Sequence, residues 1–159
     1  MLLRETLVLN LAGLIKVPMM TIAVPRVMSL DAQSCSIKVP LRWRTKNHVG
    51  SMYIAVLTLG AELSIGVPAM FAIHKGHRKV VLIFKDFHAD YRKRADGDVL
   101  FRCDEVRAIT DAVSRADSTG ERVTIPVHTV ALVPDKYGDE PVAQFTLGLS
   151  LKRKDKKSQ

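Results

Sequence analysis

The longest nearly uncharged stretch of the sequence, residues 47–68, contains one acidic residue, Glu62. It predicts a helix that begins near Ser51, a suitable N-cap, and that ends at Pro68, which is poorly compatible with a helix interior. Such a helix is apolar on almost every side, which predicts that other structure wraps around it. At the helical period Glu62 shares one narrow stripe with Ser51 and Thr58, so a lone carboxylate is placed among small and apolar neighbours.

Alternation of apolar and polar residues predicts strands before and after this helix. Residues 34–44 alternate with a period of two, which is typical of a strand with one buried face. Residues 70–73 are expected to begin another strand directly after the helix. Later β-rich runs predict further strands at residues 79–89, 99–103, 122–134 and 142–151.

A second helical pattern lies at the N-terminus, where Leu7, Leu11 and the pair Leu14–Ile15 suit an amphipathic helix that caps the domain. Contact of this helix with a membrane surface is the less favoured alternative. A signal peptide is not expected, because charged residues come early and interrupt the apolar run. Neither uncharged run in this region approaches the roughly 20 residues that a spanning helix needs, so no membrane span is expected.

A short helix at residues 105–116, with Asp104 as its N-cap, interrupts the strand series. The element order is therefore helix, strand, long apolar helix, and then several strands with one inserted helix. This order predicts an α+β protein in which an antiparallel sheet curls around one central helix. We expect a single domain over residues 1–151 and a basic C-terminal tail over residues 152–159.

The net charge of +8 is weak evidence for an anionic partner of the domain, because half of this charge lies in the C-terminal tail. The remaining sequence lacks the interleaved aromatic and basic residues of single-strand binders, which argues against a nucleic-acid partner. Cys35 and Cys103 fall in strand patterns and are interpreted as reduced core residues of a cytoplasmic protein, since no spacing supports a disulfide. The five histidines show no zinc spacing, and neither a metal nor a separate cofactor is expected.

The central stretch resembles the signature of hotdog-fold acyl-CoA thioesterases of the phenylacetyl-CoA and medium-chain type. In that family the pattern Asn-x-x-Gly-Thr-x-His-Gly-Gly is followed by an acidic residue nine positions after the histidine. The corresponding positions here, without a gap, are Asn47, Gly50, Ser51 and Glu62. The departures are Tyr53 at the histidine and Ile54 and Ala55 at the two glycines. The N-terminal helix and the inserted helix are also less typical, which indicates a separate thioesterase-like branch.

The resemblance implies that the protein hydrolyses an acyl-CoA thioester, with Glu62 as the general base or the nucleophile. Coenzyme A is then part of the substrate. A carboxylate in apolar surroundings has a raised pKa and can accept a proton from water, or it can attack the thioester directly through an anhydride. The structural alternative is that Glu62 only pairs with an arginine, or with Thr58 and Ser51.

The resemblance also assigns roles around the carboxylate. Asn47 would orient the water or the thioester carbonyl, although asparagine is also a common turn residue before a helix. The backbone N–H groups near Tyr53 and Ile54 would bind the carbonyl oxygen. The substrate-binding candidates are Gly50, Ser51 and Thr58 near the carboxylate, and Arg92, Lys93, Arg94 and the tail lysines for the phosphates of coenzyme A, with a solvated loop and tail as the alternative.

Tyr53 and Glu62 are nine residues apart and face opposite sides of one helix at about 100° per residue. One helix therefore cannot bring both to one carbonyl, which predicts a homodimer, or a dimer of dimers, with sites at the interface. A catalytically silent hotdog dimer that binds an acyl chain or an acyl carrier stays open, since the His-Gly-Gly triplet is lost. A charge-driven binder of nucleic acid or of another anionic surface is disfavoured by where the charge lies.

Overall fold

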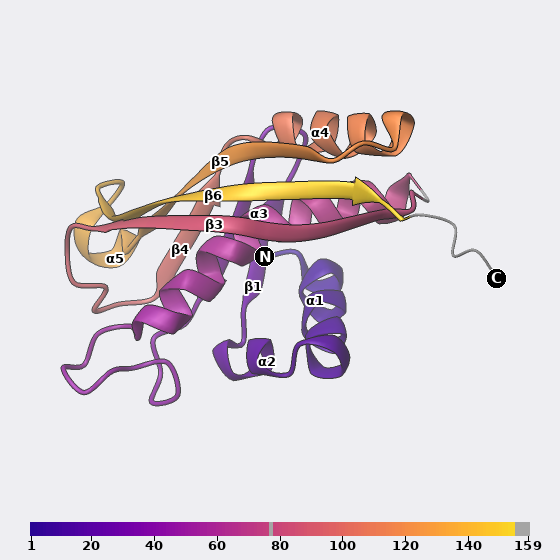
Figure 1. The fold of residues 1–159 in the computed structure, drawn as a ribbon. Coiled ribbons are helices and arrows are strands. Elements are labelled where there is room, and N and C mark those ends of the chain that lie inside the picture. Colours follow the sequence, from indigo (N-terminus) through magenta and orange to yellow (C-terminus); the bar gives the residue numbers. More distant parts are fainter. Residues whose placement is uncertain (77, 155–159) are drawn as a thin grey trace.

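The computed structural model describes residues 1–154 apart from residue 77 (Figure 1). The helices are α1 (Leu3–Lys16), α2 (Met19–Ala23), α3 (Ile54–Lys75), α4 (Val106–Thr119) and α5 (Pro134–Tyr137). The strands are β1 (Arg26–Leu30), β2 (Cys35–Val39), β3 (Val80–Tyr91), β4 (Val99–Cys103), β5 (Val123–Leu132) and β6 (Pro141–Arg153). The chain is therefore an α+β protein, as the sequence predicted.

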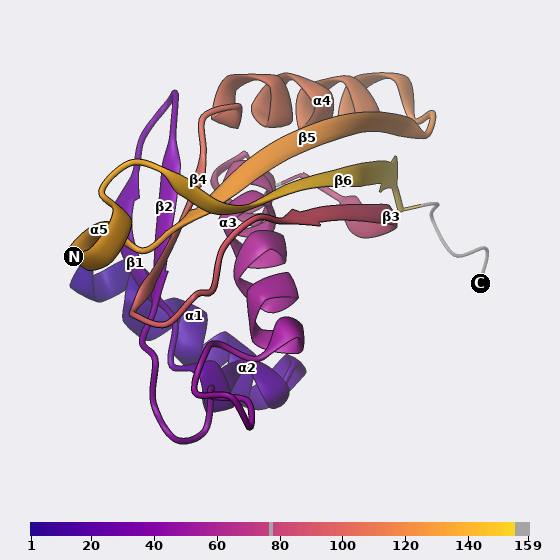
Figure 2. The same cartoon turned by 90° about the vertical axis from the view of Figure 1, so that its left-hand side faces the viewer.

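The strands form one antiparallel sheet in the order β1-β2-β4-β5-β6-β3. In Figures 1 and 2 the strands β5, β6 and β3 run side by side along one face, while β1, β2 and β4 cross them at a steep angle. The sheet curls around α3 in this way, and β3 forms one of its edges. The architecture of a curled sheet wrapped around a long central helix is confirmed.

The core lies between α3 and the inner face of the sheet. Half of the helix side chains are buried, including Ala61 and Ile65, which are fully enclosed. The sheet contributes Phe101 and Phe145, whose ring centroids are 6.4 Å apart. Burial of apolar area at about 25 cal/mol per Å² is the main force that holds this helix against the strands.

Helix α3 is longer than the sequence predicted and continues through Pro68 to Lys75. A proline in a helix interior costs about 3 kcal/mol, because it removes one hydrogen bond and crowds the preceding turn. That cost is offset here because Pro68 is itself buried, and Ala69 and Ile73 beyond it pack into the core. The prediction that a strand begins at residues 70–73 was therefore wrong, because these residues belong to α3.

The start of α3 also differs from the prediction. Its N-cap is Tyr53, which makes no side-chain capping bond, and not Ser51. The preceding strand ends at Val39, well before residue 44, because Pro40 leads into a loop. Trp43, expected on the buried face of that strand, is 83% exposed in the loop.

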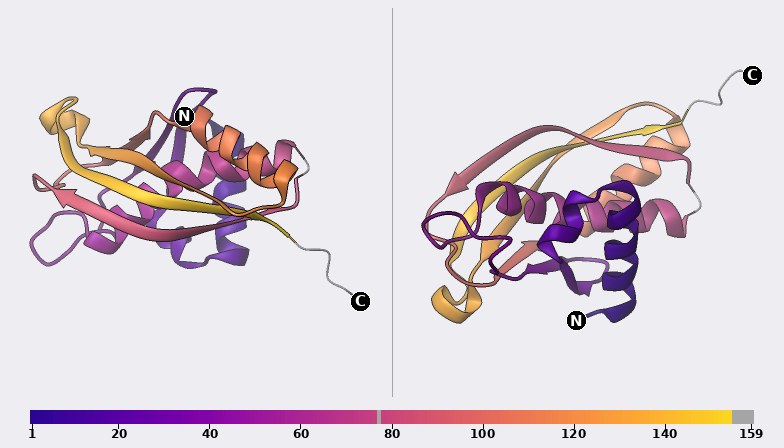
Figure 3. Two further views of the ribbon diagram at one scale, coloured as in Figure 1. Left: turned by 45° about the horizontal axis from the view of Figure 1, so that its top comes forward. Right: turned by 90° about the horizontal axis from the view of Figure 1, so that it is seen from below.

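Helix α1 is confirmed, but the face predicted to pack on the domain points outward. Its apolar side chains at Leu7, Leu11, Leu14 and Ile15 are all more than half exposed. Polar bonds attach the other face instead: Asn10 donates to the carbonyl of Pro25 at 3.0 Å, and the Thr6 hydroxyl accepts from the Val27 amide at 2.9 Å. Helices α1 and α2 lie on the opposite side of α3 from α4 (Figures 1 and 3).

The inserted helix α4 is confirmed, with Val106, Ile109 and Val113 buried as its spacing predicted. Asp104 does not cap it, because its carboxylate pairs with the Arg102 guanidinium at 3.2 Å. The last strand, β6, extends to Arg153, so Lys152 and Arg153 belong to the sheet rather than to the tail. The tail lysines Lys156 and Lys157 lie outside the described residues.

Among the residues that the structure describes, α3 is the one helix long and apolar enough to cross a membrane by length and composition. Half of the most apolar segment of this helix is buried inside the protein. Contacts with β2, β4 and β5 surround it, so α3 is the core helix of the fold.

Candidate active site

A groove of about 440 Å³ runs between α3 and the edge of the sheet. Among the residues that the structure describes, Glu62 is the only acidic one that lines this groove. The remaining lining residues are Thr58 from α3, Leu82, Ile83, Phe84 and Phe87 from β3, and Leu147 from β6. A single carboxylate against apolar walls is suited to a substrate that has one reactive polar group on an apolar chain.

Glu62 has no hydrogen bond or ion pair with any other residue that the structure describes. The Glu62 residue is exposed to solvent, yet reduced hydration beside the apolar groove raises the pKa of its carboxyl group above the ordinary 4.5. None of the described residues therefore supports the alternative that Glu62 only takes part in a structural pair. The Thr58 hydroxyl donates to the carbonyl of Ile54 at 3.1 Å, and the Ser51 hydroxyl contacts Asn47.

The loop before α3 is organised by Asn47. Its side-chain oxygen accepts from the backbone N–H groups of Val49 and Ser51, each at 3.1 Å, and its side-chain nitrogen donates to the Ser51 hydroxyl at 3.1 Å. Gly50 closes this turn with a φ of +82°, a left-handed conformation that favours glycine. The polar groups of Asn47 are therefore engaged within the loop, as expected of a turn residue.

The N-terminus of α3 presents backbone donors one residue later than the resemblance implied. The Tyr53 amide donates to the carbonyl of Thr45 at 2.8 Å, so this N–H is already used. The amides of Ile54 and Ala55, in the first turn, have no acceptor among the described residues. The side chains of Tyr53 and Ile54 are half exposed, so this helix end is open to a ligand.

These donors and the carboxylate do not meet within one chain. Ile54 and Glu62 are eight residues apart on α3. At 1.5 Å per residue, their backbones are about 12 Å apart along the helix axis. The structure therefore places the expected oxyanion donors and the expected base at separate points on the surface.

Comparison with known proteins assigns the sequence to a family. Residues 6–146 match DUF4442, a domain of unknown function. The chain belongs to the DUF4442 family. No curated protein matches its sequence.

Solved structures similar to this DUF4442 chain include several thioesterases. A candidate thioesterase from Shewanella oneidensis has a TM-score of 0.78 and 13% identity, covering 95% of this chain and 99% of that chain. A protein of unknown function from Pseudomonas aeruginosa, described as a probable thioesterase, has a TM-score of 0.73 and 20% identity, covering 92% and 95%. A Haemophilus influenzae thioesterase has a TM-score of 0.63 and 12% identity, covering 94% and 93%. These likenesses confirm that the DUF4442 chain has the hotdog fold.

In the DUF4442 chain, Arg92, Lys93 and Arg94, which were expected to bind phosphates, interact with other residues of the protein. Arg92 pairs with Asp90 at 2.8 Å and also donates to Gln144, while Lys93 pairs with Glu140 at 2.5 Å. The Arg94 guanidinium donates to the carbonyl of Val49 in the loop before α3. None of the three residues lines the groove that contains Glu62.

Within the described part of the chain, no group of three or more histidine, cysteine or acidic residues could hold a metal ion. Cys35 and Cys103 are free thiols that lie directly opposite each other on β2 and β4. Burial raises the pKa of Cys35 to about 12 and that of Cys103 to about 11, so neither thiol is a ready nucleophile.

The walls of the groove could not be predicted from the sequence. Leu82, Phe84 and Phe87 come from β3, which is distant in sequence from α3. The alternation of β3 pointed to a strand with two distinct faces, but it could not show which helix face would lie against it. The Ala55 amide was not among the predicted donors, because the bond from the Tyr53 amide to Thr45 depends on how the loop folds.

Proposed function

We propose that this DUF4442 protein is a thioesterase that hydrolyses acyl-CoA thioesters at the groove containing Glu62. The observation that carries the proposal is a carboxylate without a partner in the described chain, set in an apolar groove on the central helix of a hotdog fold. The thioesterases among its structural neighbours support the same chemistry. We place the reaction in the cytoplasm, where buried thiols such as Cys35 and Cys103 stay reduced.

In the proposed reaction the acyl chain lies along the apolar walls and the thioester carbonyl lies near Glu62. The carboxylate takes a proton from water, and the water oxygen attacks the carbonyl carbon. The C–S bond then breaks, and Glu62 returns the proton to the leaving thiolate, giving a carboxylic acid and free coenzyme A. Direct attack by Glu62 is the second route: its oxygen bonds to the carbonyl carbon, the C–S bond breaks, and coenzyme A leaves as a thiolate that takes a proton from water. Water then hydrolyses the acyl-enzyme anhydride, which releases the carboxylic acid and restores Glu62.

The oxyanion of the tetrahedral intermediate needs donors at about 2.7–3.1 Å. Within one chain the Ile54 amide is about 12 Å along the helix from Glu62, which is too far for both to act on one carbonyl. We therefore assign the donors, the amides of Ile54 and Ala55, to a second copy of the chain. The active unit is a homodimer in which each site combines Glu62 from one protomer with the α3 N-terminus of its partner.

A non-catalytic hotdog dimer that binds an acyl chain or an acyl carrier is the second candidate. Two observations favour it: Ile54 occupies the position of the first family glycine with a half-exposed side chain, and Asn47 is engaged within its own loop. A binder of this kind would take an acyl chain into the groove and would release it unhydrolysed.

The test is a panel assay of acyl-CoA hydrolysis with the wild type, Glu62→Gln and the control Glu121→Gln, an exposed glutamate outside the groove. We expect hydrolysis by the wild type and by the control. Glu62→Gln keeps the side-chain shape but removes its basicity, so kcat should fall by about 10²–10⁴. Equal turnover by a folded Glu62→Gln protein would refute the assignment. Acyl binding without hydrolysis by the wild type would favour the second candidate.

A further inference from the structure

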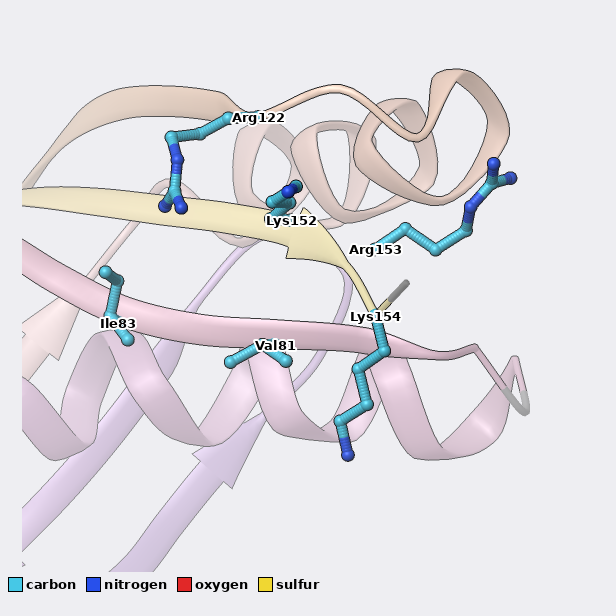
Figure 4. A pocket seen from close by; sticks show the side chains of 6 residues that line it. All are labelled: Val81, Ile83, Arg122, Lys152, Arg153 and Lys154. Atoms are coloured by element: carbon cyan, nitrogen blue, oxygen red, sulfur yellow. The ribbon is translucent and has the colours of Figure 1, made fainter. Parts of the chain in front are cut away.

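A second hollow, of about 280 Å³, lies at the end of β6 on the face of the sheet that points away from α3 (Figure 4). Four of its lining residues are basic and two are aliphatic: Arg122, Lys152, Arg153, Lys154, Val81 and Ile83. None of the described residues that line it is acidic. A concave site with this composition attracts an anionic ligand that also has an uncharged part.

The sheet fixes the floor of this basic pocket. Ser150 of β6 is 1% exposed and lies opposite Ile83 on β3 and Thr124 on β5. Its hydroxyl accepts from the Arg122 guanidinium at 3.0 Å and contacts the Thr124 hydroxyl at 3.1 Å. This hydrogen bond holds Arg122 across the pocket, and its remaining N–H groups have no acceptor among the described residues.

Three of the four basic residues of the pocket have no carboxylate partner among the residues that the structure describes. Within the described chain, Arg122, Arg153 and Lys154 form no ion pair, although Arg153 donates to the backbone carbonyl of Asp117 at 2.8 Å. Closely placed cations repel one another unless an anion lies between them. Guanidinium groups match the oxygen geometry of phosphate, and a lysine adds a point charge. Phosphate groups are therefore the ligand chemistry that this pocket fits best.

The pocket adjoins the groove that contains Glu62. Ile83 lines both hollows, so the edge strand β3 is all that separates them at this point. No other strand in the described chain pairs with the outer edge of β3, which leaves a path over that edge. A flexible ligand can thus have its acyl thioester beside Glu62 and its phosphates on the far side of β3.

We propose that the basic pocket binds the phosphorylated nucleotide end of a coenzyme A thioester, an inference that rests on the proposed function. Arg122, Lys152 and Lys154 bind the phosphates, while Val81 and Ile83, both at least 41% exposed, contact the uncharged part of the nucleotide. Arg153 is left out, because its guanidinium is bonded to the carbonyl of Asp117 and its side chain extends away from Arg122 (Figure 4). A hollow of about 280 Å³ suits a small molecule better than the broad acidic surface of a carrier protein.

A binding experiment tests the pocket without requiring hydrolysis. Adenosine 3′,5′-bisphosphate, the isolated nucleotide end of coenzyme A, is titrated calorimetrically into the wild type, Arg122→Gln and Lys154→Gln. Arg107→Gln serves as the control, since Arg107 is an exposed arginine on α4 outside the pocket. We expect the wild type and the control to bind the bisphosphate but not adenosine. Binding should weaken about tenfold or more in Arg122→Gln, and Lys154→Gln should weaken it in the same direction.

Thermal melts confirm that each variant is folded before its titration is interpreted. Equal affinity for the bisphosphate in the wild type and in both pocket variants would overturn the proposal. The proposal would also be overturned if the wild type did not bind the bisphosphate. Binding of an acidic carrier protein in place of the bisphosphate would be one such case.

A kinetic comparison then tests whether the ligand is part of the substrate. For Arg122→Gln we expect a higher KM for an acyl-CoA at unchanged kcat, and an unchanged KM for the matching acyl-pantetheine, which has no phosphates. An unchanged KM for acyl-CoA at low salt would overturn the assignment. If the wild type hydrolyses neither thioester, the proposed function fails, and the bisphosphate titration still decides whether the pocket binds the nucleotide.

Discussion

At the scale of a single residue, the carboxyl group of Glu62 has reduced hydration and no cationic partner in the described chain. Apolar side chains from β3 reduce the hydration of its carboxyl group, and no cation in the described chain compensates. Without such a partner the charged form is disfavoured, so the pKa of Glu62 is raised. A raised pKa brings a carboxylate closer to the value at which it exchanges protons with water near neutral pH.

The raised pKa also predicts how Glu62 affects stability. Folding penalises the carboxylate form, so the penalty is present above the raised pKa and disappears below the ordinary value of 4.5. Glu62→Gln should therefore be more stable than the wild type at pH 7, and the difference should vanish as the pH falls below 4.5. Urea unfolding at pH 7 and at pH 4 measures this. A Gln variant that is less stable at pH 7 would instead indicate that the carboxylate takes part in a stabilising ion pair.

At the scale of elements, the close packing of α3 on β4 depends on a glycine. A Cβ atom at Gly60 would lie 2.2 Å from the Phe101 ring, and Phe101 is fully buried. At Gly66 the nearest atom to such a Cβ would be in the Phe84 ring, at 3.9 Å, an ordinary contact. The same helix therefore contains one glycine that the packing requires and one that it does not.

This difference predicts opposite effects for the same substitution. Gly60→Ala should destabilise the protein by about 1–3 kcal/mol, because the added methyl group overlaps the fully buried Phe101 ring. Gly66→Ala should stabilise it by about 0.5–1 kcal/mol through higher helix propensity. Chemical denaturation of both variants measures the two values. A shift of the same sign in both would contradict the packing described for α3.

Elements whose faces follow a regular local pattern could be predicted from the sequence. The strand at residues 99–103 and the buried face of α4 were placed correctly, because one alternation or one helical stripe determines each. The outward face of α1 could not be predicted, since the helix is apolar on more than one side. The continuation of α3 past Pro68 depends on burial by other elements, which a local pattern does not contain.

The candidate site was only partly predictable for a related reason. Glu62 stood out because a carboxylate in an apolar helix is costly, and this is a local property. The groove walls on β3, and the use of the Tyr53 amide by Thr45, arise from contacts between distant segments. The phosphate candidates at Arg92 and Lys93 were chosen by charge alone, and the structure shows that each has an acidic partner.

At the scale of the whole molecule, a single chain holds the parts of the proposed site but does not assemble them. Glu62 lies in the groove, and the free amides of Ile54 and Ala55 lie about two turns away at the end of α3. The surface also exposes apolar side chains on α1, on α3 and along β3. An exposed apolar surface of this extent is typical of a protein that associates with a partner. A second copy would cover part of it and complete the site.

The most direct test of the shared site combines two variants that are each defective at a different part of it. Glu62→Gln removes the base. Ile54→Pro removes one oxyanion donor, because proline has no backbone N–H. The fold should tolerate this change, since Ile54 is the first residue of α3, where proline is common. Tyr53 also already has the extended backbone that is favoured before a proline. Each variant alone should lose most thioesterase activity, by about 10²–10³ for the missing donor.

The two variants are co-expressed with different tags, and the mixed dimers are isolated by two affinity steps. In a shared site, the intact Glu62 of one protomer meets the intact Ile54 amide of its partner, so each mixed dimer has one complete site. We predict that the mixed dimers recover about half of the wild-type thioesterase activity, since one of two equivalent sites is restored. Mixed dimers no more active than the parent variants would contradict a site shared between two copies of the chain.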